Sequence, residues 1–204
     1  MERHHPRPLE PVNGESDGRA FDGAVLAGGA SRRMGTDKAF IPIGGIPMVE
    51  RVAAALTEAG ARRVVVVGGD GPRVADLGLD WVADPQPGLG PLAGLVTALT
   101  ELVGPTVVLP CDLIQPDAFP IGRLVDTLVA TPGADVALPV GAPDMPADVL
   151  FAAWRPTALE PARRLLTEGV RAPRALVAQL ETVEVMGLGA EWRADADHPG
   201  DLPR

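Results

Sequence analysis

The sequence predicts a single α/β domain of three layers, α/β/α, in which helices cover both faces of a mostly parallel sheet. Short apolar runs rich in β-branched residues alternate along the chain with segments whose apolar residues recur at helical spacing. Polar residues do not interrupt the apolar runs, which is typical of parallel strands buried on both faces. The chain has 204 residues and shows no internal repeat or linker, so one domain is the simplest architecture.

The first half of the chain shows three strand patterns and two helix patterns. Residues 1–20 are expected to form a flexible tail, and the domain is expected at 21–204. A first strand is predicted at 24–26. The helix pattern at 47–60 has proline in its first turn and glycine at its end, with apolar residues on one face at Val49, Val52, Ala53 and Leu56. Further elements are a buried strand at 64–67, a short strand at 79–84 and a helix at 91–102.

The second half continues the alternation of strands and helices. Buried or half-buried strands are predicted at 106–109, 135–140, 148–154 and 182–187. Helices are predicted at 121–129 and 158–169. Strands separated by helices are the arrangement that places a parallel sheet between two helical layers.

The composition limits the classes of partner. The formal net charge is -9, which argues against nonspecific binding to nucleic acid and against a polybasic membrane surface. No apolar run approaches the roughly 18 residues of a membrane span, and the first residues lack a signal-peptide pattern. Cys111 is the single cysteine and cannot form an internal disulfide, so a reducing compartment, the cytoplasm, is expected. A local cluster of positive charge in such a chain is therefore informative.

Such a cluster follows the first strand, in the stretch AVLAGGASRRMGTDKAF at 24–40. Gly28 and Gly29 come directly after the strand, where open α/β sheets bind ligands, and glycine lets backbone N–H groups approach an anion. An ordinary turn is the alternative for a glycine pair alone. The P-loop pattern is absent because Lys38 does not follow Gly35 directly, and the dinucleotide pattern G-x-G-x-x-G is absent as well.

The same segment matches a longer pattern, L-A-G-G-x-S-x-R-M-G-x-D-K. The matching residues are Leu26, Ala27, Gly28, Gly29, Ser31, Arg33, Met34, Gly35, Asp37 and Lys38. This pattern resembles the signature loop of nucleotidyltransferases that transfer a nucleoside monophosphate, and more narrowly that of the molybdenum cofactor guanylyltransferases. Downstream segments resemble the family in order: G-P-L-A-G at 90–94, a strand end with Asp112, and a late segment with Asp195, Asp197, Pro199 and Asp201. The resemblance implies a Rossmann-like fold of the nucleotide-diphospho-sugar transferase type.

The resemblance also implies a reaction and its catalytic residues. A phosphate oxygen of molybdopterin would attack the α-phosphate of GTP, and pyrophosphate would leave. Because the nucleophile is already anionic, positioning and charge neutralisation matter more than a general base. Arg33 would fork across phosphate oxygens and Lys38 would act as a point charge. A solvated arginine run is the alternative for Arg33, and a surface pair with Asp37 is the alternative for Lys38.

The metal and the nucleotide contacts are assigned through the same resemblance. Asp112 ends a buried strand, where a carboxylate is costly without a cation or hydrogen bonds, and the family places Mg²⁺ there. Asp197 would be the second metal ligand, with Asp195 as the alternative, and plain turns or caps are the competing explanations for these aspartates. The expected nucleotide-binding residues are Leu26, Ala27, Gly28, Gly29, Lys38, Asp84, Gly90 and Pro91.

Two departures from the family keep other functions open. Gly68 and Gly69 stand where the guanylyl family tends to place a base-reading asparagine, and residues 141–154 lack its H-P-x-x-A pattern. A related transferase that uses CTP or another phosphorylated acceptor is therefore an alternative, as is a nucleotide-binding regulator without catalysis. A dehydrogenase is disfavoured by the missing G-x-G-x-x-G pattern.

The remaining expectations concern Cys111 and the partners. All three histidines, His4, His5 and His198, lie in the terminal regions, so Cys111 is expected to be a buried structural thiol and not a nucleophile. The expected partners are GTP and a molybdopterin-type or other phosphorylated small molecule, without nucleic acid or membrane. A monomer is expected.

Overall fold

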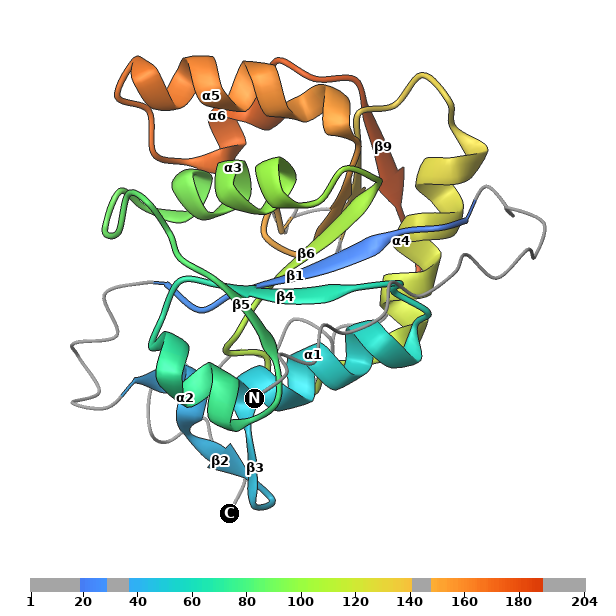
Figure 1. The fold of residues 1–204 in the computed structure, drawn as a ribbon. Coiled ribbons are helices and arrows are strands. Elements are labelled where there is room, and N and C mark those ends of the chain that lie inside the picture. The colour runs from blue at the N-terminus through green and yellow to red at the C-terminus, as the bar shows by residue number, and fades with distance from the viewer. Residues whose placement is uncertain (1–18, 29–36, 141–147, 189–204) are drawn as a thin grey trace, which may run out of the picture.

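A seven-stranded sheet forms the middle layer of the protein, in the order β5-β4-β1-β6-β8-β7-β9 (Figure 1). The computed structural model describes residues 19–28, 37–140 and 148–188. The strands of the sheet are β1 (Asp22–Leu26), β4 (Val64–Val67), β5 (Asp80–Val82), β6 (Thr106–Pro110), β7 (Val136–Pro139), β8 (Ala152–Trp154) and β9 (Thr182–Val185). Each strand predicted from the sequence is present in this sheet. The predicted tail lies almost entirely outside the described residues.

One strand of the sheet runs against its neighbours. β1 pairs in parallel with β4 and β6, β4 with β5, and β7 with β9. β8 is antiparallel to both β6 and β7. The prediction of a mostly parallel sheet is confirmed. Because β8 runs the other way, the chain enters β8 from the edge at which β6 ends.

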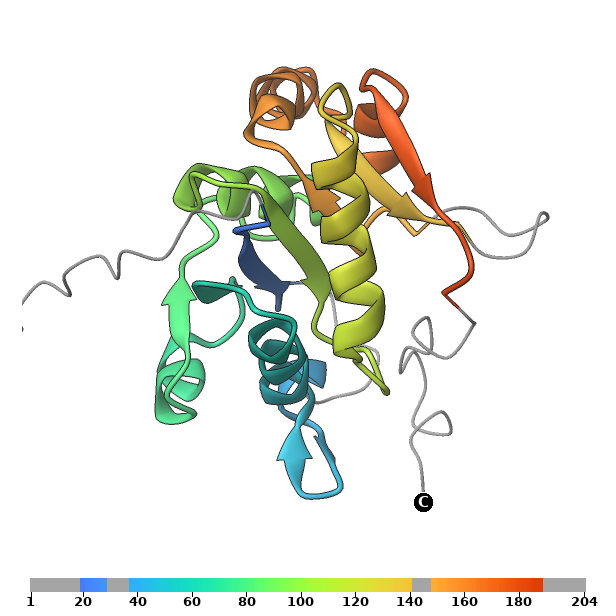
Figure 2. The same ribbon diagram turned by 90° about the vertical axis from the view of Figure 1, so that its right-hand side faces the viewer.

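Two layers of helices cover the sheet, which confirms the predicted three-layer α/β/α class (Figures 1 and 2). The helices are α1 (Met48–Glu58), α2 (Gly71–Asp76), α3 (Pro91–Glu101), α4 (Ala118–Ala130), α5 (Leu159–Thr167) and α6 (Pro173–Val177). α1 and α4 contact each other and pack on one face, while α3 packs on the other face with α5 and α6 beyond it. Within the described residues, no helix combines the length and the apolarity needed to cross a membrane.

The uninterrupted apolar strands follow from burial on both faces. In β4, Val66 belongs to the apolar cluster under α1 and α4, whereas its neighbour Val65 belongs to the cluster under α3 and α5. Val25 and Ala24 of β1 divide in the same way. Since successive strand residues point to opposite faces, each position of a central strand enters a core. All four of these side chains are fully buried.

The sequence patterns missed several short elements. They are η2 (Lys38–Phe40), the hairpin of β2 (Pro42–Ile43) and β3 (Ile46–Pro47), α2, η3 (Pro156–Ala158) and α6. None of them is long enough to establish a helical or strand period. The hairpin did carry a local signal, because Gly44 and Gly45, at φ +61° and +86°, are the residues that a tight two-residue turn requires.

Candidate functional site

The carboxyl ends of four neighbouring strands meet at one edge of the sheet. Leu26 of β1 is in register with Val67 of β4 and with Pro110 of β6, and Val67 is in register with Val82 of β5. The segments that follow these strands therefore lie side by side, and they contain most of the described residues that the sequence assigned to nucleotide and metal. We call this region the nucleotide edge, defined by residues 26–28, 67–70, 82–84 and 110–112.

The nucleotide edge brings Lys38 and Asp112 together. The Nζ atom of Lys38 lies 3.5 Å from Oδ2 of Asp112, and the two side chains are 14% and 24% exposed. Lys38 opens η2, which Asp37 caps by accepting the N–H of Ala39 at 3.1 Å. Asp37 therefore caps η2, and Lys38 pairs with Asp112, which lies 74 positions later in the chain.

Lys38 is chemically distinctive in this sequence. It is the only lysine among the 18 lysine and arginine residues of the chain. A lysine ammonium is a compact point charge on a flexible stem, whereas arginine presents a planar fork. The single lysine of the chain is therefore the residue that pairs with Asp112, just after the end of β6.

A hydrogen bond fixes the start of the Asp112 segment. The N–H of Cys111 donates to the carbonyl of Leu26 at 3.1 Å and so continues the pairing of β6 with β1. The neighbouring loop is also tied to α1, because Arg51 donates through Nη2 to the carbonyl of Ile114 at 3.1 Å. Asp112 is consequently held between a strand end and a tethered loop.

Cys111 has the properties of an unreactive thiol. Burial, together with the negative charges of Asp112 and Asp37, raises the pKa of the Cys111 thiol to about 12. A thiol with this pKa remains protonated at neutral pH and is a poor nucleophile. This agrees with the structural role expected from the sequence.

Glycine backbone and Asp84 form the other side of the nucleotide edge. A Cβ atom built on Gly68 would lie 3.4 Å from the Cα and N atoms of Gly28 and 3.6 Å from Cβ of Asp84. One built on Gly69 would lie 3.1 Å from Cβ of Ala27. A Cβ on Gly28 would meet no atom of the described residues within 4 Å. Within the described part of the chain, the space beside Gly28 is therefore open, as the approach of a ligand to the backbone requires.

Asp84 is positioned by a turn. Its Oδ1 accepts the N–H of Gln86 at 2.9 Å, the pattern of an Asx turn. The same side chain that forms the turn also borders Gly68 at the nucleotide edge.

Gly90 and Pro91 open α3, as the sequence predicted, with Gly90 at φ +88°. A neighbour that the sequence did not indicate is Arg171, whose carbonyl accepts the N–H of Leu92 at 3.3 Å. The Leu26 side chain packs under α3, because a Cβ on Gly94 would lie 3.3 Å from it, and Leu26 is only 8% exposed. Leu26 can therefore offer a ligand its main chain and little of its side chain.

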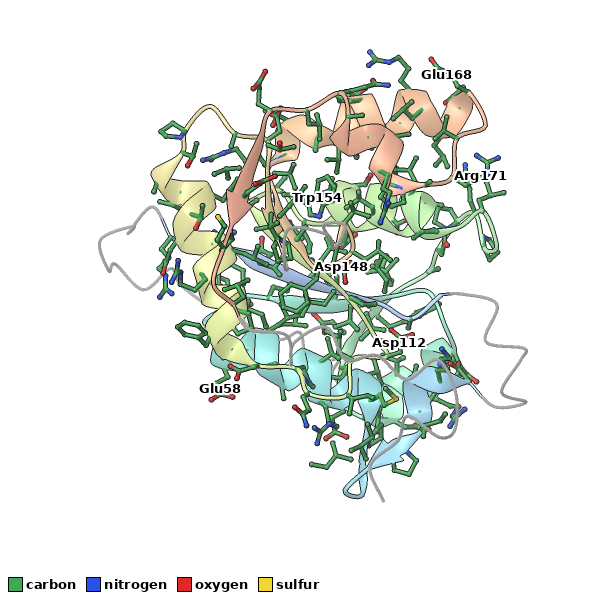
Figure 3. The ribbon with its side chains drawn as sticks, turned by 180° about the vertical axis from the view of Figure 1, so that it is seen from behind. Glu58, Asp112, Asp148, Trp154, Glu168 and Arg171 are labelled. Carbon is green, nitrogen blue, oxygen red and sulfur yellow. The ribbon has the colours of Figure 1, made fainter. Side chains whose placement is uncertain are left out.

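Asp148 lies four residues before β8, the strand that is antiparallel to β6. Its Oδ1 accepts the N–H of Leu150 at 3.0 Å. Asp112 and Asp148 are both labelled in Figure 3. The sequence analysis did not single out Asp148.

Three of the predicted site residues, Gly29, Arg33 and Asp197, lie outside the described residues, as does Asp195. Within the described part of the chain, no group of three or more metal-ligating side chains forms a ready metal site. Of the two predicted metal ligands, Asp112 and Asp197, Asp112 is the one that lies within the described residues.

Comparison with known proteins identifies the family. Residues 23–183 match the model of the MobA-like NTP transferase domain. The chain belongs to this family. The match runs from β1 into β9 and includes the nucleotide edge.

Two named relatives are similar to this MobA-like chain, one over most of its length and the other over about half. A probable molybdenum cofactor guanylyltransferase of Opitutus terrae is 35% identical over 91% of this chain and 94% of that protein. A molybdenum cofactor guanylyltransferase of Xanthomonas euvesicatoria pv. vesicatoria is 42% identical, although the match spans only 52% of this chain and 54% of that protein. These relatives confirm the family resemblance noted in the sequence.

A solved structure has the same fold. Molybdopterin-guanine dinucleotide biosynthesis protein A of Archaeoglobus fulgidus superimposes with a TM-score of 0.69 at 22% identity, over 89% of this MobA-like chain and 94% of that protein. The predicted Rossmann-like transferase fold is confirmed by this likeness.

Proposed function

We propose that this protein transfers GMP from GTP to molybdopterin carrying molybdenum and releases pyrophosphate. The observation that carries the proposal is the meeting of Lys38 and Asp112, 3.5 Å apart, beside the open backbone at Gly28. A cation, a carboxylate suited to a hard divalent ion, and accessible glycine backbone are the groups that a metal–triphosphate complex needs. The names of the MobA-like relatives support GTP and molybdopterin as the substrates.

In the proposed reaction, a terminal phosphate oxygen of molybdopterin attacks the α-phosphorus of GTP. A new O–P bond forms while the bond from the α-phosphorus to the bridging oxygen of the β-phosphate breaks, and that oxygen leaves with pyrophosphate. Lys38 exchanges its partner Asp112 for a phosphate oxygen and neutralises part of the charge that develops there. Arg33, on the preceding loop, is proposed to do the same through its planar fork.

Asp112 fits a role as the ligand of Mg²⁺. Its side chain is 24% exposed, so one oxygen can reach an ion while the ion keeps water and phosphate oxygens. Mg²⁺ typically binds to enzymes through one or two carboxylates together with substrate phosphates, and it would supply charge neutralisation between the phosphates. We propose Asp197 as the second ligand, with Asp195 as the alternative. The cytoplasm as the location and a monomer as the active form stay predictions.

The nucleoside is proposed to contact main chain at Leu26, Ala27, Gly28 and Gly29, together with Asp84 and the start of α3 at Gly90 and Pro91. Of these, Asp84 and Gly28 border the same glycine turn. Backbone groups there provide both donors and acceptors, as a purine or pyrimidine edge requires.

One observation favours a second candidate, a related transferase with another nucleotide. Gly68 has no side chain with which to read a base, and both its backbone groups are engaged: its N–H donates to Val82 and its carbonyl accepts from Trp81. Selectivity for guanine must therefore come from other groups. A transferase for CTP or another NTP would use the same edge and the same chemistry.

The test is a panel of GTP, CTP, ATP and UTP, each with Mg²⁺, in a thermal-shift assay followed by pyrophosphate release with molybdopterin as acceptor. A ligand that binds only the folded state raises the melting temperature. The proposal expects the largest shift and the product with GTP. A larger shift with CTP selects the second candidate, and binding without pyrophosphate release over a panel of acceptors selects a non-catalytic regulator.

A further inference from the structure

Trp81 lies outside the nucleotide edge but contacts one of the turns that form it. It belongs to β5, the outermost strand, and is 42% exposed. Its indole Nε1–H donates to the carbonyl oxygen of Gly68 at 2.8 Å. Its ring also lies against Gly71, because a Cβ there would come within 2.7 Å of two ring carbons. The indole therefore contacts both ends of the turn at 68–71.

This turn is built from residues with broad conformational freedom. Gly68 and Gly69 have φ values of +76° and +68°, in the left-handed region that glycine enters without strain. Such residues lose the most conformational entropy on ordering, so the turn depends on external contacts to remain in place. At the Gly68 carbonyl that contact comes from Trp81.

The turn is at the same time a wall of the nucleotide edge. A Cβ built on Gly68 would lie 3.4 Å from the backbone of Gly28 and 3.6 Å from the side chain of Asp84. A Cβ built on Gly69 would lie 3.1 Å from that of Ala27. A shift of the turn by even one ångström would move this wall against the residues proposed to receive the nucleoside. Asp112 belongs to another segment of the nucleotide edge, and Lys38 pairs with it from η2.

We propose that Trp81 is a positioning residue for nucleotide binding, which holds the 68–71 turn in the conformation that receives the nucleoside. The inference rests on the proposed function and adds a residue that touches no substrate. Without the indole N–H, the turn samples other conformations, and the apparent affinity falls by the fraction of molecules that remain competent to bind. Binding is affected and the chemical step is not, since the groups around the phosphates stay in place.

The test uses Trp81→Phe, which keeps an aromatic ring over Gly71 and removes the N–H. Trp154→Phe is the matched control: Trp154 is fully buried in β8, and its Nε1 has no hydrogen-bond partner. We would measure the Kd for GTP with Mg²⁺ by calorimetry, KM and kcat for pyrophosphate release, the melting temperature, and amide exchange of residues 69–71 in the free protein.

The expected result is that Trp81→Phe weakens binding and Trp154→Phe lowers stability. Trp81→Phe should raise Kd and KM about three- to tenfold, the range for loss of one hydrogen bond, with kcat within about twofold and faster amide exchange at 69–71. Trp154→Phe should lower the melting temperature because it leaves a cavity, with Kd unchanged.

Three results would overturn the inference. If the wild type binds GTP and Trp81→Phe matches it in Kd and in amide exchange, only the role of Trp81 fails. If Trp154→Phe raises Kd as much as Trp81→Phe does, the effect is general destabilisation. If the wild type binds no nucleoside triphosphate, the proposed function fails and the positioning role fails with it.

Discussion

Replacing Lys38 with methionine tests the ion pair and the reaction in one variant. Methionine keeps most of the length of the side chain and removes its charge. At an effective dielectric constant of about 20, two unit charges 3.5 Å apart attract by roughly 5 kcal/mol. Much of this attraction is offset by the cost of taking both groups out of water. Because the side chains keep 14% and 24% exposure, we expect a net loss of stability of roughly 1–2 kcal/mol.

The effect on activity should be larger than the effect on stability. A loss of about 1–2 kcal/mol lowers the melting temperature of a domain of this size by roughly 2–8 °C. Removing one charged group that stabilises the developing phosphate charge lowers kcat by about 10²–10³. The assay is continuous detection of pyrophosphate with saturating GTP and Mg²⁺, beside thermal melts of the same preparations.

Two companion variants make the result decisive. Arg63→Met removes a surface cation that pairs with Asp80 and Glu101 at 45% exposure, and it should leave kcat unchanged. Lys38→Arg keeps the charge but replaces the point charge with a fork, and it should recover only part of the activity. A folded Lys38→Met protein with kcat within tenfold of the wild type would refute the reasoning.

Four further variants or reagents test the site and the fold. Asp112→Asn keeps the shape and removes the ligand charge, so Mg²⁺-dependent turnover should fall about 10²-fold or more while the fold is kept, as a Mg²⁺ titration of pyrophosphate release and circular dichroism would show. Gly28→Ala places a methyl group where no described atom lies within 4 Å. The free energy of unfolding in urea should therefore change by less than about 0.5 kcal/mol, while the Kd for GTP measured by calorimetry should rise roughly tenfold or more. Gly71→Ala places Cβ 2.7 Å from the Trp81 ring and should lower the free energy of unfolding in urea by about 1–3 kcal/mol. Gly133→Ala, whose Cβ would meet no described atom within 4 Å, should leave this free energy unchanged. Equal losses in the two variants would contradict the close contact of Trp81 with Gly71. Cys111, with a pKa raised to about 12, has roughly one thiolate in 10⁴ at pH 8, so a chromogenic disulfide reagent should react fast in urea and slowly without it.

The sheet could be predicted from the sequence because its central strands bury nearly every residue. A run such as Val64–Val67 has a β-branched residue at each position, and only a strand covered on both faces uses all of them. The direction of β8 could not be predicted in this way. Its three residues, Ala152–Trp154, are apolar in either direction, and pairing with β6 depends on contacts remote in sequence.

The site was predictable where a motif fixes the chemistry and obscure where it depends on tertiary contacts. The glycine segment and the strand end indicated Lys38 and Asp112, and the structure places them together. Trp81 carries no local signal, since it contacts the nucleotide edge through the backbone carbonyl of Gly68. The structure pairs Lys38 with Asp112, while Asp37 caps η2.

A chain with a single lysine has a single side-chain target for amine chemistry. Acylating or reductively methylating reagents can modify only the N-terminal amine and Lys38. Since the Lys38 side chain is 14% exposed, the terminus should react first, and the slower second adduct should block turnover. Isotope-labelled methyl groups introduced in this way would give NMR signals from the terminal amine and from Lys38 beside Asp112. Attaching the protein through Lys38 to an amine-reactive support under forcing conditions would inactivate it.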